Sequence, residues 1–263
     1  QVLTTLFHLP SSKWITIAIL GVTCVFYTYA LLHGMKGISL LAKSCMYLFF
    51  ALLAYVLFLG GETRYILETG FAAVGNLAQN FLGLATFTDP QRTTSFPQTW
   101  TIFYWAYWMV WCVAVPFFIG SISKGRTLRQ VILGGYVFGL SGTFTSFIIM
   151  GNYGLGLQMH GKLDVLSTYT ADGNLYHAIL DILGQLPLSK AVLVLLVLCM
   201  ITFYSTSFDS ITMVASTYTY KELKSDEEPH RNVKLFWAIF LILLPLALIF
   251  SENSMTNLQT VSI

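Results

Sequence analysis

Two neighbouring stripes of aromatic residues lie within residues 98–120 and have the spacing that a pocket for a quaternary ammonium requires. The stretch reads QTWTIFYWAYWMVWCVAVPFFIG and carries no charge. On a helix with 3.6 residues per turn, the first stripe consists of Trp100, Tyr104, Tyr107 and Trp111, and the second consists of Trp105, Trp108 and Cys112. Each Tyr or Trp ring face attracts such a cation by roughly 0.5–2 kcal/mol. The pattern therefore predicts a wall of rings that holds a cation by cation–π contact.

An aromatic belt at the membrane surface is the alternative interpretation of the same residues. Tyr and Trp are enriched where a transmembrane helix meets the lipid headgroups. Such a belt should end within about two turns, whereas Trp111 lies about three turns into the stretch. Periodicity alone leaves both interpretations open.

A second segment whose residues could bind a ligand or ion, Phe203–Ser210, places hydroxyl side chains inside an apolar run. It reads FYSTSFDS. Ser and Thr oxygens, together with a backbone carbonyl freed from the helix, are hard ligands that suit Na⁺. The alternative is that these hydroxyls bond to carbonyls four residues earlier in their own helix, or bridge to another helix.

Asp209 is the acidic residue that we place inside a membrane span. Burial of a carboxylate costs several kcal/mol unless the group is paired, solvated or protonated, so an intramembrane Asp predicts a functional role. We expect Asp209 either to accept hydrogen bonds from the amides of a broken helix or to take up a proton.

The composition is typical of a polytopic membrane protein. Hydrophobic residues make up 56% of the chain and charged residues 10%, against roughly 45–50% and 25% in a soluble domain. The basic residues are dispersed in short loops, so the net charge of +2 does not indicate a nucleic-acid partner. The four cysteines have no CxxC spacing and no nearby His, and we interpret them as free thiols.

Six apolar stretches are predicted to span the bilayer. They are residues 13–33, 39–60, 98–120, 131–152, 190–217 and 235–250. The two longer stretches between them, 61–97 and 153–189, carry amphipathic patterns that suit helices lying along the membrane surface.

The basic residues predict the orientation of these spans. The short connections 34–38, 121–130 and 218–234, with Lys43 at the end of its span, hold nine of the fourteen Lys and Arg residues. Short loops rich in Lys and Arg face the cytoplasm. The stretches 61–97 and 153–189 are then predicted to face outside.

The run Thr99–Trp111, followed by the basic loop Ser121–Arg129, resembles the signature of the betaine/carnitine/choline transporters, the BCCT family. In that family the helix reads W-T-x-F-Y-W-A-W-W-x-x-W and the loop reads R-I-S-R-G-R-T-I-R, or close to these. Other stretches follow the family's order and spacing, so the resemblance covers nearly the whole chain: Gly34–Met46, Thr88–Pro97, Phe203–Ser210 and Glu227–Lys234.

The resemblance implies an all-α polytopic membrane protein with a partial five-plus-five inverted-repeat, LeuT-like fold over residues 1–263. We expect the chain to be roughly the second half of a longer transporter, with residues 98–120 as the first helix of the second repeat. Substrate lies near the midplane between repeats in such folds, so part of the pocket wall is expected from helices that precede this sequence.

The resemblance also assigns site residues. Trp108 and Trp111 match the family's aromatic box, Tyr107 stands where many members have Trp, and Trp105 is expected to line the access path or to pack against neighbouring helices. The sodium-site positions of the family match Phe203, through its carbonyl, and the hydroxyls of Thr206 and Ser207.

Two departures from the family's exchangers bear on energy coupling. Met46 stands where the sodium-independent carnitine exchangers carry an Arg, and Val115 stands where they carry a Met. Both departures favour a transporter that uses an ion rather than a fixed Arg, so Met46 and Asp209 are the remaining coupling or structural candidates.

The predicted function is therefore secondary active uptake of a quaternary-ammonium or betaine-type solute (glycine betaine, choline or carnitine) by sodium symport. The expected protein is no enzyme, needs no cofactor beyond a sodium ion, forms a homotrimer as family members commonly do, and lies in a bacterial cytoplasmic membrane. The alternatives are proton-coupled choline or betaine uptake and ion-independent exchange. More distant alternatives are a polytopic membrane enzyme and a non-transporting osmosensor.

Overall fold

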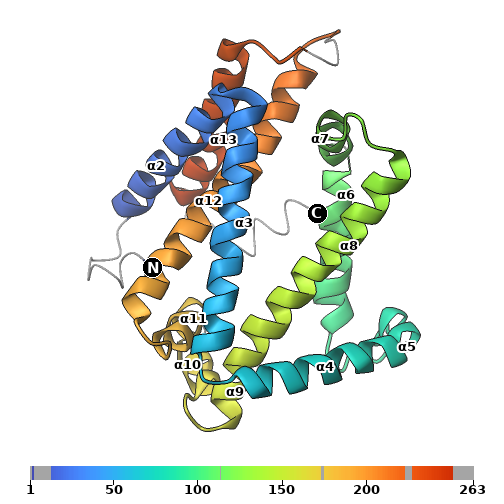
Figure 1. Cartoon of the computed structure of the whole chain (residues 1–263), viewed down its shortest axis with the longest axis vertical. Coiled ribbons are helices and arrows are strands. Elements are labelled where there is room, and N and C mark those ends of the chain that lie inside the picture. The colour runs from blue at the N-terminus through green and yellow to red at the C-terminus, as the bar shows by residue number, and fades with distance from the viewer. Residues whose placement is uncertain (1, 3–12, 113, 173–174, 223–226, 251–263) are drawn as a thin grey trace. The chain divides into compact units, whose positions relative to one another are not determined.

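The computed structural model describes residues 2, 13–112, 114–172, 175–222 and 227–250. Within this part of the chain all regular structure is helical, and the predicted all-α class is confirmed (Figure 1). The chain divides into two compact units, which we describe separately. Unit 1 comprises residues 1–12, 42–79 and 126–203, and unit 2 comprises residues 13–41, 80–125 and 204–263.

Unit 1 combines short helices with parts of two long ones. Its elements are α4 (Thr63–Gln79), α8 (Leu128–Ser146), the π-helical turn η2 (Phe147–Gly151), α9 (Asn152–Met159), α10 (Val165–Asp172) and α11 (Leu175–Gly184). It also includes the larger part of α3 (Gly34–Leu59) and the first half of α12 (Ser189–Tyr218).

The core of unit 1 forms where α4 packs against η2 and α9. Ile66 of α4 is fully buried with Tyr153 of α9 and Val56 of α3. Gly70 permits this close packing, because a Cβ atom there would lie 2.4 Å from the side chain of Ile148. The stretches 61–97 and 153–189, predicted to hold surface helices, thus contribute α4 and α9 to a buried core.

Unit 2 contains α2 (Lys13–Leu32), α5 (Phe81–Ala85), the π-helical turn η1 (Pro97–Thr101), α6 (Ile102–Trp111), α7 (Ala114–Ile122) and α13 (Arg231–Phe250). The helices α2 and α13 lie side by side (Figure 1). Tyr27 of α2 is fully buried and donates a hydrogen bond to the carbonyl of Ala238 in α13. Met213 brings the second half of α12 into the same core.

Four helical stretches among the described residues are long and apolar enough to cross a membrane: Trp14–Leu32, Lys36–Leu59, Leu128–Met159 and Ser189–Tyr218. They overlap four of the six predicted spans. The predicted span 98–120 consists of η1, α6 and α7, and its residue 113 lies outside the described residues. The predicted span 235–250 lies within α13. The exact set of spans and their orientation stay predictions.

Candidate functional site

The aromatic residues of α6 form a continuous ladder of rings in unit 2. Tyr107 is its centre: its ring centroid lies 6.0 Å from that of Phe103, 6.1 Å from that of Trp108 and 6.2 Å from that of Trp111. The Phe103 ring is stacked on Tyr107, while the Trp108 ring meets it edge-on at 83°. The structure therefore brings Tyr107, Trp108 and Trp111 into one cluster.

The ring faces of this cluster differ in exposure. Trp105 is 71% exposed and Trp108 is 62% exposed. Trp111 is half-buried. Because cation–π attraction requires an accessible ring face, Trp108 presents a surface on which a cation could rest, and Trp105 lies on an open face of the same helix.

Trp111 also lies beside the second half of α12. A small apolar cavity of about 50 Å³ is lined by Trp111 of α6, by Val115 and Phe118 of α7, and by Ser210, Ile211 and Val214 of α12. The last predicted aromatic-box residue and the end of the Phe203–Ser210 segment are therefore neighbours within unit 2.

The Phe203–Ser210 segment lies in a helix that continues from Ser189 to Tyr218. This segment is continuous helix, and hydroxyls along it bond to carbonyls of the preceding turn, which is the alternative that the sequence left open. Ser210 donates to the carbonyl of Thr206 at 2.9 Å, and Thr212 donates to that of Phe208 at 2.6 Å. The hydroxyl pattern of α12 is thus partly that of an ordinary membrane helix.

The three predicted sodium ligands follow one another along this helix. Phe203 is 46% exposed, Thr206 is half-buried and Ser207 is exposed. Their roles as ion ligands stay a prediction. Among the described residues there is no group of three or more His, Cys, Asp or Glu side chains that could hold a metal ion.

Among the described residues of unit 2, Asp209 is the most deeply buried ionisable side chain, with no exposed surface. Neither carboxylate oxygen has a hydrogen-bond partner among the residues that the structure describes, and the same holds for the hydroxyl of Ser205, one turn earlier. The amides of α12 are engaged in an unbroken helix, so the expected bonds from broken-helix amides to Asp209 are not formed. The coupling candidate Met46 lies on α3 in unit 1 and is 49% exposed.

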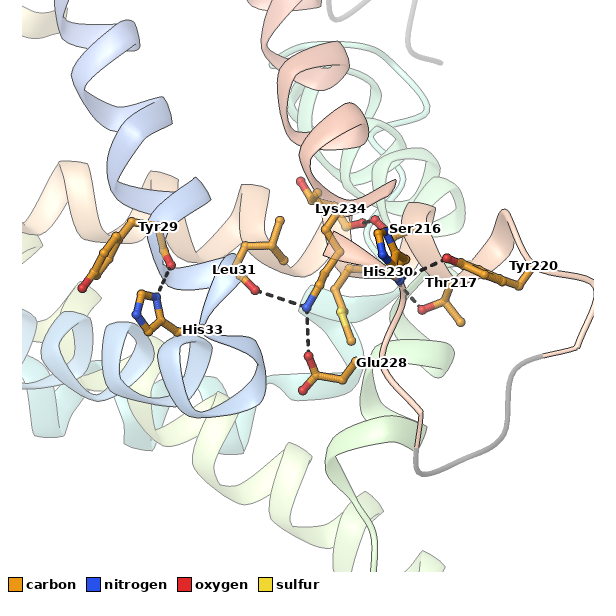
Figure 2. A network of polar contacts seen from close by, with 11 residues as sticks. Tyr29, Leu31, His33, Ser216, Thr217, Tyr220, Glu228, His230 and Lys234 are labelled. Carbon is orange, nitrogen blue, oxygen red and sulfur yellow. Dashed lines mark hydrogen bonds and ion pairs between the residues drawn. The ribbon is translucent and has the colours of Figure 1, made fainter. Parts of the chain in front are cut away.

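Lys234 at the start of α13 is a buried cation that the sequence analysis did not single out. It is 5% exposed, and its ammonium donates to Oε2 of Glu228 at 2.8 Å and to the carbonyl of Leu31 at 3.4 Å. Figure 2 shows the ammonium between these two acceptors. Through these two contacts Lys234 connects Glu228, in the segment before α13, to Leu31 at the end of α2.

Gly34 makes room for this ion pair. Its φ of +65° is a left-handed conformation that glycine adopts without strain. A Cβ atom at this position would lie 2.6 Å from both carboxylate oxygens of Glu228. The turn between α2 and α3 therefore requires glycine for two independent reasons.

A second cluster in unit 1 surrounds Glu62, between α3 and α4. Glu62 is 3% exposed. Its Oε2 accepts a hydrogen bond from Nδ1 of His160 at 2.8 Å, and its Oε1 forms an ion pair with the ammonium of Lys162 at 2.6 Å. Burial by itself would raise the pKa of Glu62, but the bonds from Lys162 and His160 outweigh it and hold the pKa below its ordinary value. These residues border an open cavity of about 420 Å³. The sequence analysis missed this cluster because its members are far apart in the chain.

The loop that leads into η1 and α6 is organised by Asp89. Its carboxylate accepts bonds from the backbone amides and hydroxyls of Thr93 and Thr94 and from the amide of Ser95, at 2.9–3.1 Å. Burial alone would raise the pKa of Asp89, but these donors lower it to about 2. An Asp followed by several Ser and Thr residues was a local signal that could have predicted this turn.

The family model for betaine/carnitine/choline family transporters matches residues 1–263, and the chain belongs to this family. It is a transporter-family protein rather than an enzyme, and a multi-pass protein of the cytoplasmic membrane. The family prediction from the aromatic run and the basic loop is thereby confirmed.

Curated relatives from bacteria support this assignment. A carnitine transporter of Acinetobacter baumannii is 28% identical over 100% of this chain and 48% of its own length. An osmo-dependent choline transporter of Acinetobacter baylyi is 30% identical over 99% of the chain and 38% of its own length. A glycine betaine transporter of Bacillus subtilis is 30% identical over 99% of the chain and 50% of its own length. The chain thus spans half or less of the length of these relatives.

Proposed function

We propose that the full-length protein takes up a quaternary-ammonium or betaine-type solute by secondary active transport. The observation that carries this proposal is the ring ladder of α6, with Trp108 exposed beside Tyr107 and Trp111. A trimethylammonium group cannot donate a hydrogen bond, so several ring faces are the chemistry that replaces its water shell. The names of the curated relatives, which include carnitine, choline and glycine betaine transporters, support the same substrate class.

In this proposal each box residue has a separate task. Trp108 and Trp111 supply ring faces to the cation, and Tyr107 adds a hydroxyl that can bond to a carboxylate or hydroxyl of the solute. Trp105 lines the access path. The proposal names a class of substrates and not a single one, because glycine betaine, choline and carnitine all carry the same trimethylammonium group.

We infer sodium symport as the coupling mode. Phe203, Thr206 and Ser207 stand at positions i, i+3 and i+4 on one face of α12, where a carbonyl and two hydroxyls provide hard oxygen ligands. The neutral Met46 offers no fixed positive charge in place of an ion. An ion that binds the outward-open state more tightly than the inward-open state would favour the outward-open state. A homotrimeric assembly is part of the proposal and rests on the family resemblance alone.

Sodium-driven uptake by the full-length protein in proteoliposomes tests the coupling. Radiolabelled glycine betaine, choline and carnitine are supplied with and without an inward sodium gradient at fixed pH. We expect sodium-driven accumulation, and we expect Thr206→Ala and Ser207→Ala to raise the sodium concentration for half-maximal uptake.

Thr217→Ala is the matched control for these variants. Thr217 lies on the same helix and its hydroxyl bonds to the carbonyl of Met213 at 2.9 Å, so its loss should leave the sodium dependence unchanged. Uptake that is indifferent to sodium would reject the sodium assignment and favour proton coupling or exchange.

A further inference from the structure

The loop of residues 88–98, which leads into η1, is closed at its ends and built around one carboxylate. Nε2 of Gln98 donates to the carbonyl of Thr88 at 3.0 Å, so the two ends of the loop lie together. Asp89 is 3% exposed, and its carboxylate accepts five hydrogen bonds at 2.9–3.1 Å. The donors are the amides and hydroxyls of two successive threonines and the amide that follows them: Thr93, Thr94 and Ser95. One buried side chain therefore determines the path of the loop.

Three residues of this loop have a backbone conformation that residues with a Cβ atom rarely adopt. The φ angles are +45° at Asp89, +52° at Arg92 and +52° at Ser95. Such left-handed conformations are unfavourable outside glycine, and they persist where surrounding contacts hold them in place. The amides of Arg92 and Ser95 donate to the backbone carbonyl and to the carboxylate of Asp89, respectively, both at 2.9 Å. The loop therefore depends on Asp89 for its conformation.

Hydrogen bonds continue from this loop into the first turn of the aromatic helix. The amide of Ser95 donates to Oδ2 of Asp89, and its carbonyl accepts the amide of Thr99 in η1 at 3.0 Å. The turn η1 is π-helical, because the amide of Ile102 donates to the carbonyl of Pro97, five residues earlier. Single π-helical turns are rare and frequently occur at functional sites. The position of η1 is thus connected to Asp89 through Ser95.

The π-helical turn determines which way the rings of α6 face. It contains roughly one residue more than an α-helical turn, so the residues after it are rotated by about 100° relative to an uninterrupted α-helix. The ring ladder begins inside this turn, where Trp100 stacks on Tyr104 at a centroid distance of 6.2 Å. The next stacked pair is Phe103 and Tyr107 at 6.0 Å. A shift of η1 to α-helical geometry would therefore redirect Tyr107 and the exposed ring of Trp108.

A purely local role for Asp89 is the alternative, and Asp164 in unit 1 provides the comparison. Oδ1 of Asp164 accepts the amide of Ser167 at 3.1 Å and Nε2 of Gln158 at 3.3 Å, at the start of α10. This carboxylate also organises a loop before a helix, but that helix carries none of the proposed box residues. A variant of Asp164 thus separates the loss of a loop-organising carboxylate from the loss of ring positioning.

We propose that Asp89 is a positioning residue for the aromatic box. Its carboxylate holds the loop of residues 88–98, the loop holds η1 in π-helical geometry, and η1 sets the direction in which Tyr107 and Trp108 present their rings. The hold on η1 is a property of the fold alone. The consequence for uptake rests on the proposed transport function, in which these rings bind the cation.

Hydrogen–deuterium exchange of the full-length protein in detergent tests the hold on η1 without transport. Asp89→Asn replaces one acceptor oxygen by an NH2 group that would face the amides of the loop, so we expect the amides of residues 93–102 to exchange at least about tenfold faster. Asp164→Asn is the matched control and should leave these amides unchanged. Thr93→Val removes one of the five donors and should accelerate the same amides less, and this variant serves if Asp89→Asn does not fold.

Uptake kinetics in proteoliposomes test the consequence for the box. We expect Asp89→Asn to raise the half-saturation concentration of the best transported solute by about 2–30-fold, the range of a cation–π contribution. It should also reduce the preference for that solute over a neutral analogue with a tert-butyl group in place of the trimethylammonium. A purely structural role would lower only the maximal rate, because fewer molecules would be folded. Asp164→Asn should keep both the half-saturation concentration and the preference.

Two results would overturn the proposal. In the first, the amides of residues 93–102 exchange equally fast in the wild type, Asp89→Asn and Thr93→Val. In the second, exchange is faster but the half-saturation concentration and the preference are unchanged. A wild-type protein that takes up no quaternary-ammonium solute would refute the transport function and, with it, the role of Asp89 in uptake, whereas the exchange rates would still show whether Asp89 holds η1.

Discussion

At the scale of single residues, buried carboxylates divide into those that have donors and one that has none. The carboxylate of Glu62 contacts the ammonium of Lys162 and Nδ1 of His160, and the carboxylate of Asp89 accepts bonds from amides and hydroxyls of its own loop. Both lie outside the predicted spans, and their pKa values are lowered. Asp209 has no hydrogen-bond donor in the described structure. At Glu62 and Asp89 the surrounding groups therefore outweigh the effect of burial on the pKa.

The Glu62 cluster predicts a pH-dependent stability. Because the pKa of Glu62 is lower in the folded protein than in the unfolded chain, its carboxylate stabilises the fold fully above the unfolded value of about 4.3, and this stabilisation is lost as pH falls through the folded pKa. We expect Glu62→Gln to lower the free energy of unfolding by about 1–2 kcal/mol at pH 7, measured as thermal stability in detergent.

The pH series provides the check on this prediction. The difference in thermal stability between the wild-type protein and Glu62→Gln should shrink below about pH 4 as the wild-type carboxylate becomes protonated. Glu68→Gln is the control, because Glu68 is exposed and pairs with the exposed Arg64, and exposed pairs contribute little. If Glu62→Gln differs from the wild type in thermal stability by the same amount at pH 7 and at pH 4, the Glu62 carboxylate does not stabilise the fold through its charge.

At the scale of elements, sequence periodicity predicted helices well and their contacts poorly. Within the first predicted stripe, the rings of Trp100 and Tyr104 and those of Tyr107 and Trp111 are in contact, whereas the Phe103 ring, which belongs to neither stripe, stacks on Tyr107. For the hydroxyls at 203–210 the sequence left open ion ligands or bonds within the helix; α12 is continuous, and Ser210 in it bonds to the carbonyl of Thr206. A Ser or Thr in a membrane helix has a backbone acceptor one turn away, so the hydroxyl pattern alone does not identify an ion site.

Contacts between distant segments could not be predicted from the sequence. Glu62 and His160 are 98 positions apart, and Lys234 and Leu31 are 203 positions apart. No periodicity connects such pairs, because their meeting depends on how helices pack. The unpartnered state of Asp209 belongs to the same category, since the sequence indicated an intramembrane acid but not which donors it lacks.

The turn between α2 and α3 predicts a position-specific effect of glycine substitution. Gly34→Ala should destabilise the protein by about 1–2 kcal/mol because of its left-handed conformation, and more if Glu228 is displaced from Lys234. Gly21→Ala is the matched control, because Gly21 lies within α2 and no atom lies within 4 Å of a Cβ placed there. Helix propensity favours Ala at that position by up to about 1 kcal/mol.

Thermal unfolding of both variants in detergent decides this prediction. A lower midpoint for Gly34→Ala together with an unchanged or higher midpoint for Gly21→Ala is the expected pair of results. Equal midpoints for the two variants would show that the Gly34 turn tolerates a side chain and would contradict the account of the Glu228–Lys234 contact.

At the scale of the whole molecule, the chain spans half or less of the length of the relatives named above. Its two units each carry a part of the candidate machinery: unit 2 carries the ring ladder, Asp209 and the Lys234 contact, and unit 1 carries the Glu62 cluster. The family could be predicted from the aromatic run and the basic loop because these motifs are long and rich in rare residues. The proposed transport requires the full-length protein, so every functional test must use it.

The most direct test of the aromatic-box proposal compares a charged solute with its neutral analogue. Whichever of glycine betaine, choline and carnitine is transported best is competed in proteoliposomes against an analogue in which a tert-butyl group replaces the trimethylammonium. The two groups have nearly the same shape, so the ratio of the two concentrations that give half-maximal inhibition measures how much the positive charge contributes to binding. We measure this ratio for the wild type, Trp108→Phe, Trp108→Ala and the control Phe138→Ala, which truncates an 80% exposed ring of α8.

The account predicts that the charged solute competes more strongly than the neutral analogue in the wild type. Trp108→Ala should reduce this preference by about 2–30-fold, which corresponds to a cation–π contribution of roughly 0.5–2 kcal/mol. Trp108→Phe should keep most of the preference, and Phe138→Ala should keep all of it. Equal inhibition by the two solutes in the wild type, or an unchanged preference in Trp108→Ala, would contradict the aromatic box.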